Sequence, residues 1–360
     1  MSDRMPRASG YFRTDYAQEI ALIKTRLERM SLIVFLALLI AFPFVASAFY
    51  LDLATQVFLA SIGALALMLL TGFAGQVSLG HAGLLAAGAF TAGILSKELN
   101  APILVTLPCA AAAGALLGIV FGLPSLRLRG LYLAVSTLAL HFVVVYLGGE
   151  YETKRGFSTG ITIDAPVIAG FRLYGGKVWY FILLAFAAAS LLICANLLRS
   201  RSGRAWRAIR AHETVAAALG INVAAYKLLA FVISSAMAAV AGALFAYYRG
   251  FVSVEAFSLF LSIQYVAMII IGGMGSLLGA LLGAAFVTLF PYLIEAMMQR
   301  LPNAQAYADV LFAVNYAAFG VVMIGFLIFE PQGLVGIWRR IQNYFLLWPF
   351  KQKPIAGGRK

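Results

Sequence analysis

Residues 256–294 read AFSLFLSIQYVAMIIIGGMGSLLGALLGAAFVTLFPYLI and contain no Asp, Glu, Lys or Arg. A helix that crosses the ~30 Å hydrocarbon core of a bilayer needs roughly 20 predominantly apolar residues. The stretch is therefore long enough for two such helices, and the glycines at 272, 273 and 275 supply a break between them. Further charge-free stretches occur at 53–96, 178–198 and 228–248. The sequence predicts a chain that crosses a membrane many times.

The composition agrees with this interpretation. Hydrophobic residues make up 62% of the 360 residues and charged residues 11%, whereas soluble domains have ~45–50% apolar and ~25% charged residues. Such a composition excludes a disordered chain and argues against a soluble enzyme. The 27 Lys and Arg residues fall in short clusters between apolar runs, so we expect no nucleic-acid partner. The predicted fold class is an all-α polytopic membrane protein.

Ten apolar runs are long enough to be membrane spans. They are residues 31–49, 53–71, 78–95, 102–122, 131–147, 178–198, 225–247, 258–275, 277–297 and 307–329. The third run is the weakest, because glycines interrupt it, and we expect it to be partly unwound. Thirty polar, mixed-charge residues precede the first run without a small-residue cleavage site after it. The first run is therefore expected to stay in the membrane rather than to be a cleaved signal peptide.

The distribution of basic residues predicts the orientation. With residue 1 in the cytoplasm and ten alternating crossings, the inside segments carry 19 Lys and Arg and the outside segments carry 7. Because cytoplasmic loops are enriched in Lys and Arg, both termini are predicted to be cytoplasmic. The chain then divides into a cytoplasmic segment (1–30), a transmembrane domain (31–329) and a cytoplasmic tail (330–360). The longest outside loop, 148–177, suits either a lid or docking surface or a solvated connector.

An internal repeat is faintly visible. Gly72, Gly75, Gly80 and Gly83 are echoed about 200 residues later by Gly272, Gly275, Gly279 and Gly283. In the ten-span arrangement, spans 2–5 begin outside and spans 7–10 begin inside. Two such halves would form an inverted repeat, which is the plan of many transporters.

The sequence lacks the common catalytic and nucleotide-binding motifs. It has no Walker A, HExxH or GxSxG motif, so we expect no catalytic residues and no ATP bound by that device. Cys109 and Cys194 lie in apolar runs without His or acidic neighbours at ligand spacing, which predicts free thiols and no metal site. The predicted spans are almost free of ionisable groups, His81 and His141 excepted. Ion-driven carriers usually bury such groups, so uphill transport would draw its energy from another chain.

Two glycine-containing segments stand out inside the membrane domain. Gly275, Gly279 and Gly283 have the spacing that places them on one helix face, where they would let a neighbouring helix approach closely. The run QVSLGHAG (76–83) contains Gln76, Ser78 and His81, the densest polar cluster at membrane depth. Irregular backbone at that depth is tolerated where protein buries it or where it lines a cavity. These three side chains therefore either line a substrate pathway or cap broken helix ends. His141 is expected to make an interhelical hydrogen bond.

The predicted inside segment 199–224 combines helix-forming residues with five arginines. Its helix is expected to stop at Gly220, because glycine commonly ends helices. Its alanines would allow close approach to a groove on a partner protein, with charged residues around the contact. The members of this candidate contact are Arg207, Arg210, Glu213, Ala216, Ala217 and Gly220. The alternative is a solvated basic loop that fixes topology and touches anionic lipid headgroups.

Four motifs in order resemble the permease family of branched-chain amino acid ABC transporters, and most closely its M-type subunit. They are GFAGQVSLGHAG (72–83), PSLRLRGLYLAVSTLAL (124–140), SRSGRAWRAIRAHETVAAALGINV (200–223) and EPQGLVGIW (330–338). The resemblance implies a bacterial inner-membrane protein in which the segment with Glu213, Ala217 and Gly220 is the coupling loop. It also implies a second permease subunit, two ATP-binding subunits and a periplasmic solute-binding protein, with ATP bound by partners and no cofactor in this chain.

The resemblance says less about which solute is carried than about the subunits of the transporter. The chain departs from the family pattern at Leu84, Phe90 and Leu131, and a Thr-Gly-Gly signature of the outside loop is reduced to 158–160. Branched-chain amino acids are the expected solutes, and urea, short amides and aromatic acids remain alternatives. A stand-alone secondary carrier or facilitator is the alternative from another class.

Overall fold

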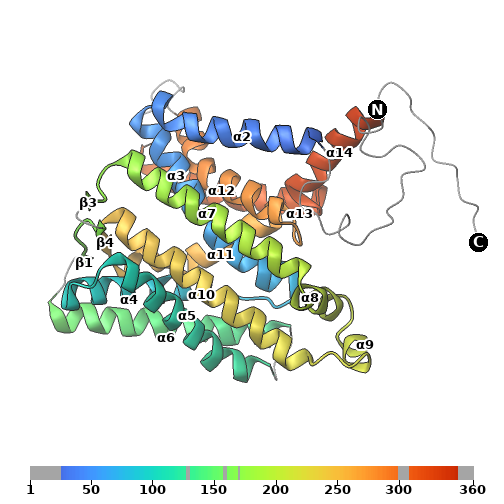
Figure 1. Ribbon diagram of the computed structural model, residues 1–360, viewed down its shortest axis with the longest axis horizontal. Helices are drawn as coiled ribbons and strands as arrows, with labels where there is room; N and C mark the ends of the chain where they lie inside the picture. The colour runs from blue at the N-terminus through green and yellow to red at the C-terminus, as the bar shows by residue number, and fades with distance from the viewer. Residues whose placement is uncertain (1–25, 127–129, 157–159, 169–170, 299–307, 348–360) are drawn as a thin grey trace, which may run out of the picture.

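The computed structural model is helical almost throughout and describes residues 26–126, 130–156, 160–168, 171–298 and 308–347 (Figure 1). Its α-helices are α2 (Arg26–Val45), α3 (Ala48–Leu67), α4 (His81–Leu99), α5 (Ile103–Ser125), α6 (Leu131–Arg155), α7 (Gly176–Arg199), α8 (Arg201–Ala211), α9 (Glu213–Ala218), α10 (Val223–Arg249), α11 (Leu259–Gly272), α12 (Leu277–Met298), α13 (Ala308–Phe329) and α14 (Gly333–Leu347). A π-helical turn, η1 (Met68–Phe73), continues α3, and a 3₁₀ turn, η2 (Val254–Phe257), precedes α11. The expected N-terminal segment up to residue 25 and the tail beyond 347 lie outside the described residues.

The long helices run roughly along one axis of the molecule (Figure 1). Four short strands lie at one end, here called the strand end. They form two antiparallel pairs, β1 (Ile161–Thr162) with β4 (Phe251–Val252) and β2 (Val167–Ile168) with β3 (Phe171–Arg172). Helices α8, α9 and α14 lie toward the opposite end, here called the α9 end. The arrangement separates the connections into two groups at the two ends of the bundle.

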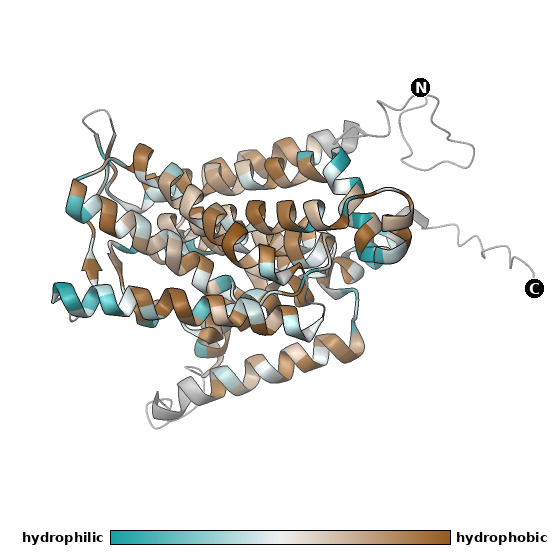
Figure 2. Ribbon diagram, turned by 90° about the horizontal axis from the view of Figure 1, so that it is seen from below, coloured by the Kyte–Doolittle hydropathy of each residue, from teal (hydrophilic) through white to brown (hydrophobic). Residues whose placement is uncertain are grey.

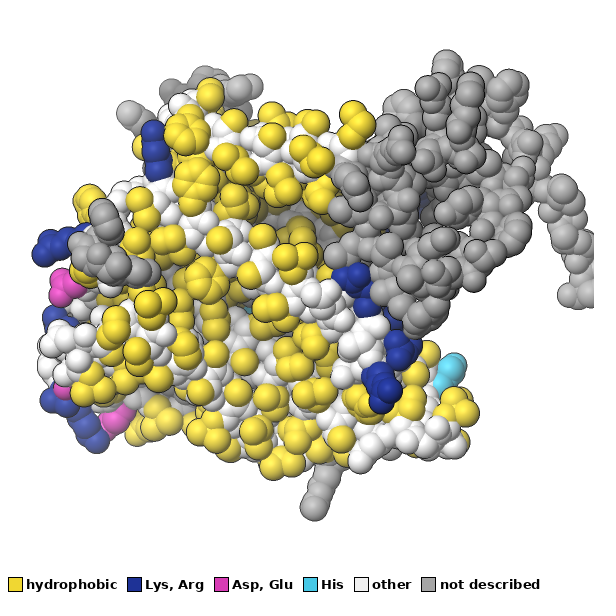
Figure 3. Space-filling view, viewed as in Figure 1, with side chains coloured by type: hydrophobic (Ala, Val, Ile, Leu, Met, Phe, Trp, Pro, Cys, Tyr) yellow, Lys and Arg dark blue, Asp and Glu magenta, His cyan; other side chains and the backbone are white. Residues whose placement is uncertain are grey.

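Apolar side chains are exposed over the middle of the bundle. Hydrophobic side chains cover the visible central face, whereas the Lys, Arg, Asp and Glu side chains gather toward the two ends (Figure 3). The helices are brown over most of their length in the hydropathy view (Figure 2). Phe35, Val120 and Leu192 are more than half exposed although they are large and apolar. Exposure of many such side chains is costly in water and favourable in lipid.

Within the described residues, six helices are long and apolar enough to cross a bilayer. A seventh span would result if Tyr316–Phe329 and Gly333–Gln342, which meet at a 53° bend, are counted together. Six of the ten predicted spans correspond to the six helices: 53–71, 102–122, 131–147, 178–198, 225–247 and 277–297. The count of ten is not confirmed by this criterion, because predicted spans 31–49 and 258–275 correspond to shorter apolar helices, Met30–Val45 and Leu259–Gly272.

The predicted third span, 78–95, is a helix only from His81 onward. Helix α4 runs from His81 to Leu99, and irregular backbone precedes it. Residues 81–90 are all buried, so α4 lies within the protein rather than on its surface. Its contacts explain this position: Gly88 lies against the backbone carbonyl of Ala239, and Gly242 lies against that of Leu85. Small residues allow α4 and α10 to pack backbone to backbone.

The connection at the strand end is shorter than predicted, because α6 continues to Arg155 and occupies the first part of the expected 148–177 loop. The remainder is tied down by the pairing of β1 with β4, which follows α10 directly. This pairing joins a connection from the first half of the chain to one from the second half.

Helices α11 and α12 pack closely through two of the three glycines predicted to form a stripe. A Cβ at Gly283 would clash with the carbonyl oxygen of Met268, and one at Gly279 would lie 2.6 Å from the carbonyl oxygen of Gly273. Gly275 differs from the expectation. It lies in the turn before α12 with φ +86°, so it does not share their helix face.

We predict that Gly283→Val lowers the thermal unfolding midpoint of the purified protein in detergent by several degrees. The two helices would have to separate, and forcing extra carbon atoms into a packed interior typically costs about 1–3 kcal/mol. Gly320→Val is the matched control, because nothing lies within 4 Å of a Cβ at that helical glycine. Equal midpoints for the two variants would contradict the close packing of α11 on α12.

Candidate functional site

The chain breaks between α3 and α4 inside the bundle. After η1 the backbone turns at Gly75, where φ is +72°, a region that favours glycine. The freed polar groups find local partners. The Thr71 hydroxyl donates to the carbonyl of Gln76 at 2.9 Å, and the amide of Leu79 donates to the Thr137 hydroxyl at 2.9 Å. Side chains from two helices therefore stabilise the broken backbone.

The three predicted pathway residues are buried inside the chain. Gln76, Ser78 and His81 are 3%, 1% and 0% exposed. The Gln76 side-chain amide donates to the carbonyl of Lys227 at 2.9 Å, and His81 Nε2 lies 3.0 Å from the carbonyl oxygen of Gly63. The Ser78 hydroxyl and His81 Nδ1 have no partner among the described residues. The three residues therefore face protein, and two of them hold backbone carbonyls.

Tyr265 of α11 packs directly on His81. The two rings meet edge to face with centroids 4.9 Å apart. Gly63 provides the room, because a Cβ there would lie 2.5 Å from the tyrosine ring. The neighbouring Ser262 accepts a hydrogen bond from the amide of Ala82 at 2.9 Å. One turn of α11 thus covers the beginning of α4.

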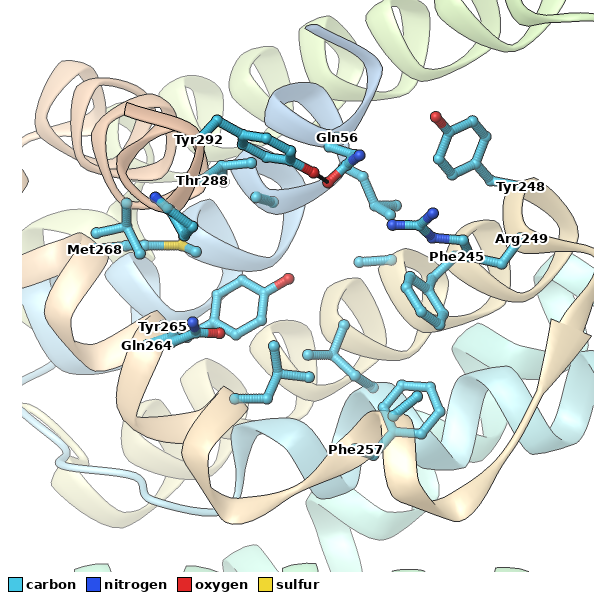
Figure 4. A pocket seen from close by; sticks show the side chains of 18 residues that line it. Gln56, Phe245, Tyr248, Arg249, Phe257, Gln264, Tyr265, Met268, Thr288 and Tyr292 are labelled. Carbon is cyan, nitrogen blue, oxygen red and sulfur yellow. Dashed lines mark hydrogen bonds between the residues drawn. The ribbon is translucent and has the colours of Figure 1, made fainter. Parts of the chain in front are cut away.

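A cavity of about 290 Å³ opens beside Tyr265 (Figure 4). Residues from α3, α4, η2, α10, α11 and α12 line it. Its polar side chains are Gln56, Tyr248, Arg249, Gln264, Tyr265, Thr288 and Tyr292. The cavity lies toward the strand end, because Gln56 is near the beginning of α3 and Arg249 is the last residue of α10. The sequence analysis did not identify it, since its members come from six separate elements.

The second glycine break, between α11 and α12, lies against the first. A Cβ at Gly72 would be 3.1 Å from the backbone nitrogen of Gly275, and the Gly275 amide lies 3.3 Å from the sulfur of Met68. The two segments that the sequence suggested as repeats are therefore neighbours in space.

Arg210 of α8 holds both breaks. Its guanidinium donates to the carbonyl oxygen of Gly72, and its stem lies over Gly75, 3.2 Å from a Cβ at that position. A Cβ at Gly275 would lie 2.7 Å from the same guanidinium. The arginine therefore connects the segment 199–224 to the interior of the bundle.

The C-terminal motif at 330–338 covers the second break. A Cβ at Gly333 would lie 2.5 Å from the carbonyl oxygen of Ile271 and 2.6 Å from the amide of Gly273. Glu330 pairs with Arg340 at 2.9 Å, across the first turns of α14. The motif thus places the amphipathic helix α14 against the α11–α12 turn.

Helix α8 is anchored at several points. Trp206 is fully buried, and its indole nitrogen donates to the carbonyl of Tyr226 at 2.8 Å. Arg207 donates to the carbonyl of Leu198 at 3.0 Å, at the end of α7. Glu213 pairs with Lys227 at 2.8 Å, and the carbonyl of the same Lys227 accepts the bond from Gln76. The first turn of α10 therefore touches both the predicted pathway and the predicted coupling segment.

Helix α9 projects from the α9 end with few neighbours (Figure 1). Ala216 faces the protein, whereas Ala217 is exposed. Val215 and Leu219, four residues apart, are 54% and 76% exposed. They form an apolar face that the sequence analysis missed, because it weighed only alanines and charges. Gly220 ends the helix with φ +82° and has nothing within 4 Å of a Cβ.

In the part of the chain that is described, no three His, Cys, Asp or Glu residues gather at metal-ligand distance. Cys194 is buried and Cys109 is partly buried, and both are free thiols.

Long apolar helices with an exposed apolar surface, and a polar break buried between them, are the features of a multi-pass helical membrane protein. The family model described as "Branched-chain amino acid transport system / permease component" matches residues 49–328. The chain belongs to this family.

Several curated relatives are similar over most of the chain. The high-affinity branched-chain amino acid transport system permease protein LivM of Salmonella typhimurium is 31% identical over 87% of this chain and 76% of its own length, and that of Escherichia coli gives the same values. The autoinducer 2 import system permease protein LsrC of Salmonella typhimurium is 28% identical over 69% of this chain and 70% of its own length. No solved structure matches the chain.

We predict that Arg210→Gln speeds amide hydrogen exchange in α8 and in the 72–76 backbone about fivefold or more. The carbonyl of Gly72 would lose a charged donor, which is worth about 1 kcal/mol or more. Arg201→Gln is the matched control, because Arg201 is an arginine at the start of the same helix, nine residues before the one that bonds to Gly72. Unchanged exchange in Arg210→Gln would show that the arginine does not hold the break.

Proposed function

We propose that this chain is one permease subunit of an ATP-driven importer in the bacterial inner membrane and forms part of the path of branched-chain or related amino acids. The main observation behind this proposal is that helix α9 projects from the protein with Val215 exposed, together with Leu219 directly after its end. Arg210 connects the same segment to the two glycine breaks. A helix of this kind suits docking on a separate ATP-hydrolysing subunit. Family membership supports the same assignment.

The helix directions support the proposed topology of ten crossings. Consecutive long helices from α2 to α7 and from α10 to α13 alternate in direction between the strand end and the α9 end (Figure 1). Ten alternating crossings would put both termini on the α9 side. We assign the α9 end to the cytoplasm, because the predicted excess of Lys and Arg falls there. The shorter α4 and α11 would cross as buried members of the bundle.

The contacts of α8 suggest how a partner's motion would reach the pathway. A force on α9 passes to Lys227 through Glu213, and Lys227 holds Gln76 through its carbonyl. A parallel route runs from α8 through Arg210 to Gly72. Both routes end at the break that carries Gln76, Ser78 and His81. These three residues are proposed to shape the pathway near the interface with a second permease subunit.

Different relatives support the proposed solute and the proposed partner subunit. The two LivM proteins match over the larger share of the chain, and their names refer to branched-chain amino acids. Two differently named permease proteins of Methanocaldococcus jannaschii, LivM and LivH, both match, which favours a pair of unlike permeases. Two ATP-binding subunits and a periplasmic solute-binding protein complete the proposed assembly. Urea, short amides and aromatic acids remain alternative solutes.

Reconstitution in liposomes tests the energy source. The assembled transporter should accumulate leucine only with ATP on the cytoplasmic side, whereas the pure chain alone should not accumulate it. Uptake by this chain alone under an ion gradient would instead establish the secondary carrier and would contradict the proposal.

A pair of variants at Gly220 tests the docking role of α9. Gly220→Ala and Gly220→Trp share the cost of a left-handed conformation, about 1–2 kcal/mol, but only tryptophan adds bulk to a surface that is empty in this chain. We predict that Gly220→Trp reduces ATP-driven transport and co-purification of the ATPase at least tenfold more than Gly220→Ala does. Membrane insertion should be equal. Equal loss in both variants would trace the effect to backbone strain and remove the support for docking.

A further inference from the structure

The cavity beside Tyr265 combines an apolar floor with a charged mouth. Leu85, Ala60 and Met268 are among the apolar side chains around it, and Arg249 lies at the strand end of α10. The guanidinium of Arg249 and the hydroxyl of Tyr265 point into the same space (Figure 4). Its volume of about 290 Å³ is at the small end of the ~300–1,000 Å³ found for ligand pockets. The space therefore suits one small solute.

Arg249 is the cation of this cavity. Its recorded contact is with the ring of Tyr248, 5.7 Å from the centroid. Across the described ranges, no carboxylate lies within ion-pair distance of it. A guanidinium presents several donors in a planar fork that matches a carboxylate. The unpaired fork at the mouth of a small cavity points to an anionic group on the ligand.

Helices α3 and α12 supply acceptors to the same cavity. The Gln56 side-chain nitrogen donates to Asp52 at 2.7 Å, and a carboxylate can only accept, so the Gln56 oxygen faces away from Asp52. That oxygen accepts from the Tyr292 hydroxyl at 3.3 Å, a long bond that leaves it available (Figure 4). Asp52 also accepts from the Tyr248 hydroxyl. An oriented carbonyl backed by a carboxylate suits an ammonium group.

We infer that this cavity is a binding site for a zwitterionic α-amino acid with an aliphatic side chain. Arg249 binds the carboxylate, Gln56 accepts from the ammonium group, and the side chain rests between Ala60 and Leu85. The inference rests on the proposed function and adds to it a site within this chain that opens toward the strand end, the side assigned to the periplasm. Tyr265 forms its floor and separates the ligand from His81.

Transport by the assembled transporter in proteoliposomes tests the role of Arg249. Arg249→Met should lower leucine uptake at subsaturating concentration about tenfold or more, because a charged hydrogen-bonding partner is lost, whereas Arg249→Lys should lose less. Arg172→Met is the matched control, since Arg172 is an exposed arginine at the same end outside the cavity. Assembly with the ATPase should be unchanged in all three.

A second pair of variants separates an amino acid from a lipid phosphate at Arg249. Ala60→Val and Ala60→Phe should shift selectivity progressively from leucine toward alanine, because they fill the floor where the aliphatic side chain lies. A headgroup held at Arg249 would make uptake insensitive to that volume.

Three outcomes would overturn the inference. They are wild-type uptake by Arg249→Met, equal losses in Arg249→Met and Arg172→Met, and no change of selectivity at Ala60. If the wild-type transporter does not move leucine at all, the proposed solute fails instead, so the two failures are distinguishable.

Discussion

This structure depends on one constraint: backbone that leaves a helix inside a membrane protein must still have its N–H and C=O groups hydrogen bonded. In hydrocarbon, each unpaired N–H or C=O group costs several kcal/mol. The chain leaves the helix twice inside the bundle, after η1 and again after α11. Thr137, Ser262 and Arg210 come from other elements and pair with backbone groups around the first break. The breaks can exist because neighbouring helices cover them.

The helices that follow and precede the breaks pack closely on their neighbours. Glycine and alanine at the contacts of α4 with α10, and of α11 with α12, let backbones touch, so α4 and α11 are held mainly by other helices. This explains why these two are shorter or less apolar than independent spans. Their stability comes mainly from packing against protein. Helices α5 and α7 instead pack on α10 and α3 along one face and leave a large part of their surface exposed.

The first turn of α10 is the point where the two proposed roles of the chain meet. Tyr226 and Lys227 bind Trp206, Glu213 and Gln76 through backbone and side-chain groups. A displacement of α9 therefore cannot leave the central break unaffected unless these contacts break. The cavity beside Tyr265 is lined by other residues than these, so the proposed solute site and the proposed ATPase contact involve different parts of the chain.

The sequence by itself determined the all-α membrane class, most of the long helices, the family and the helix stop at Gly220, because apolar length, motif order and glycine are local properties. It also singled out the polar cluster at 76–81. Only the tertiary structure decided that Gly72 meets Gly275 under Arg210, that Val215 and Leu219 are exposed, and that Arg249 shares a cavity with Gln56. These facts depend on contacts between residues about 65 to 200 positions apart, or on which face of a helix its neighbours leave uncovered. The order of residues along a single sequence does not reveal such contacts.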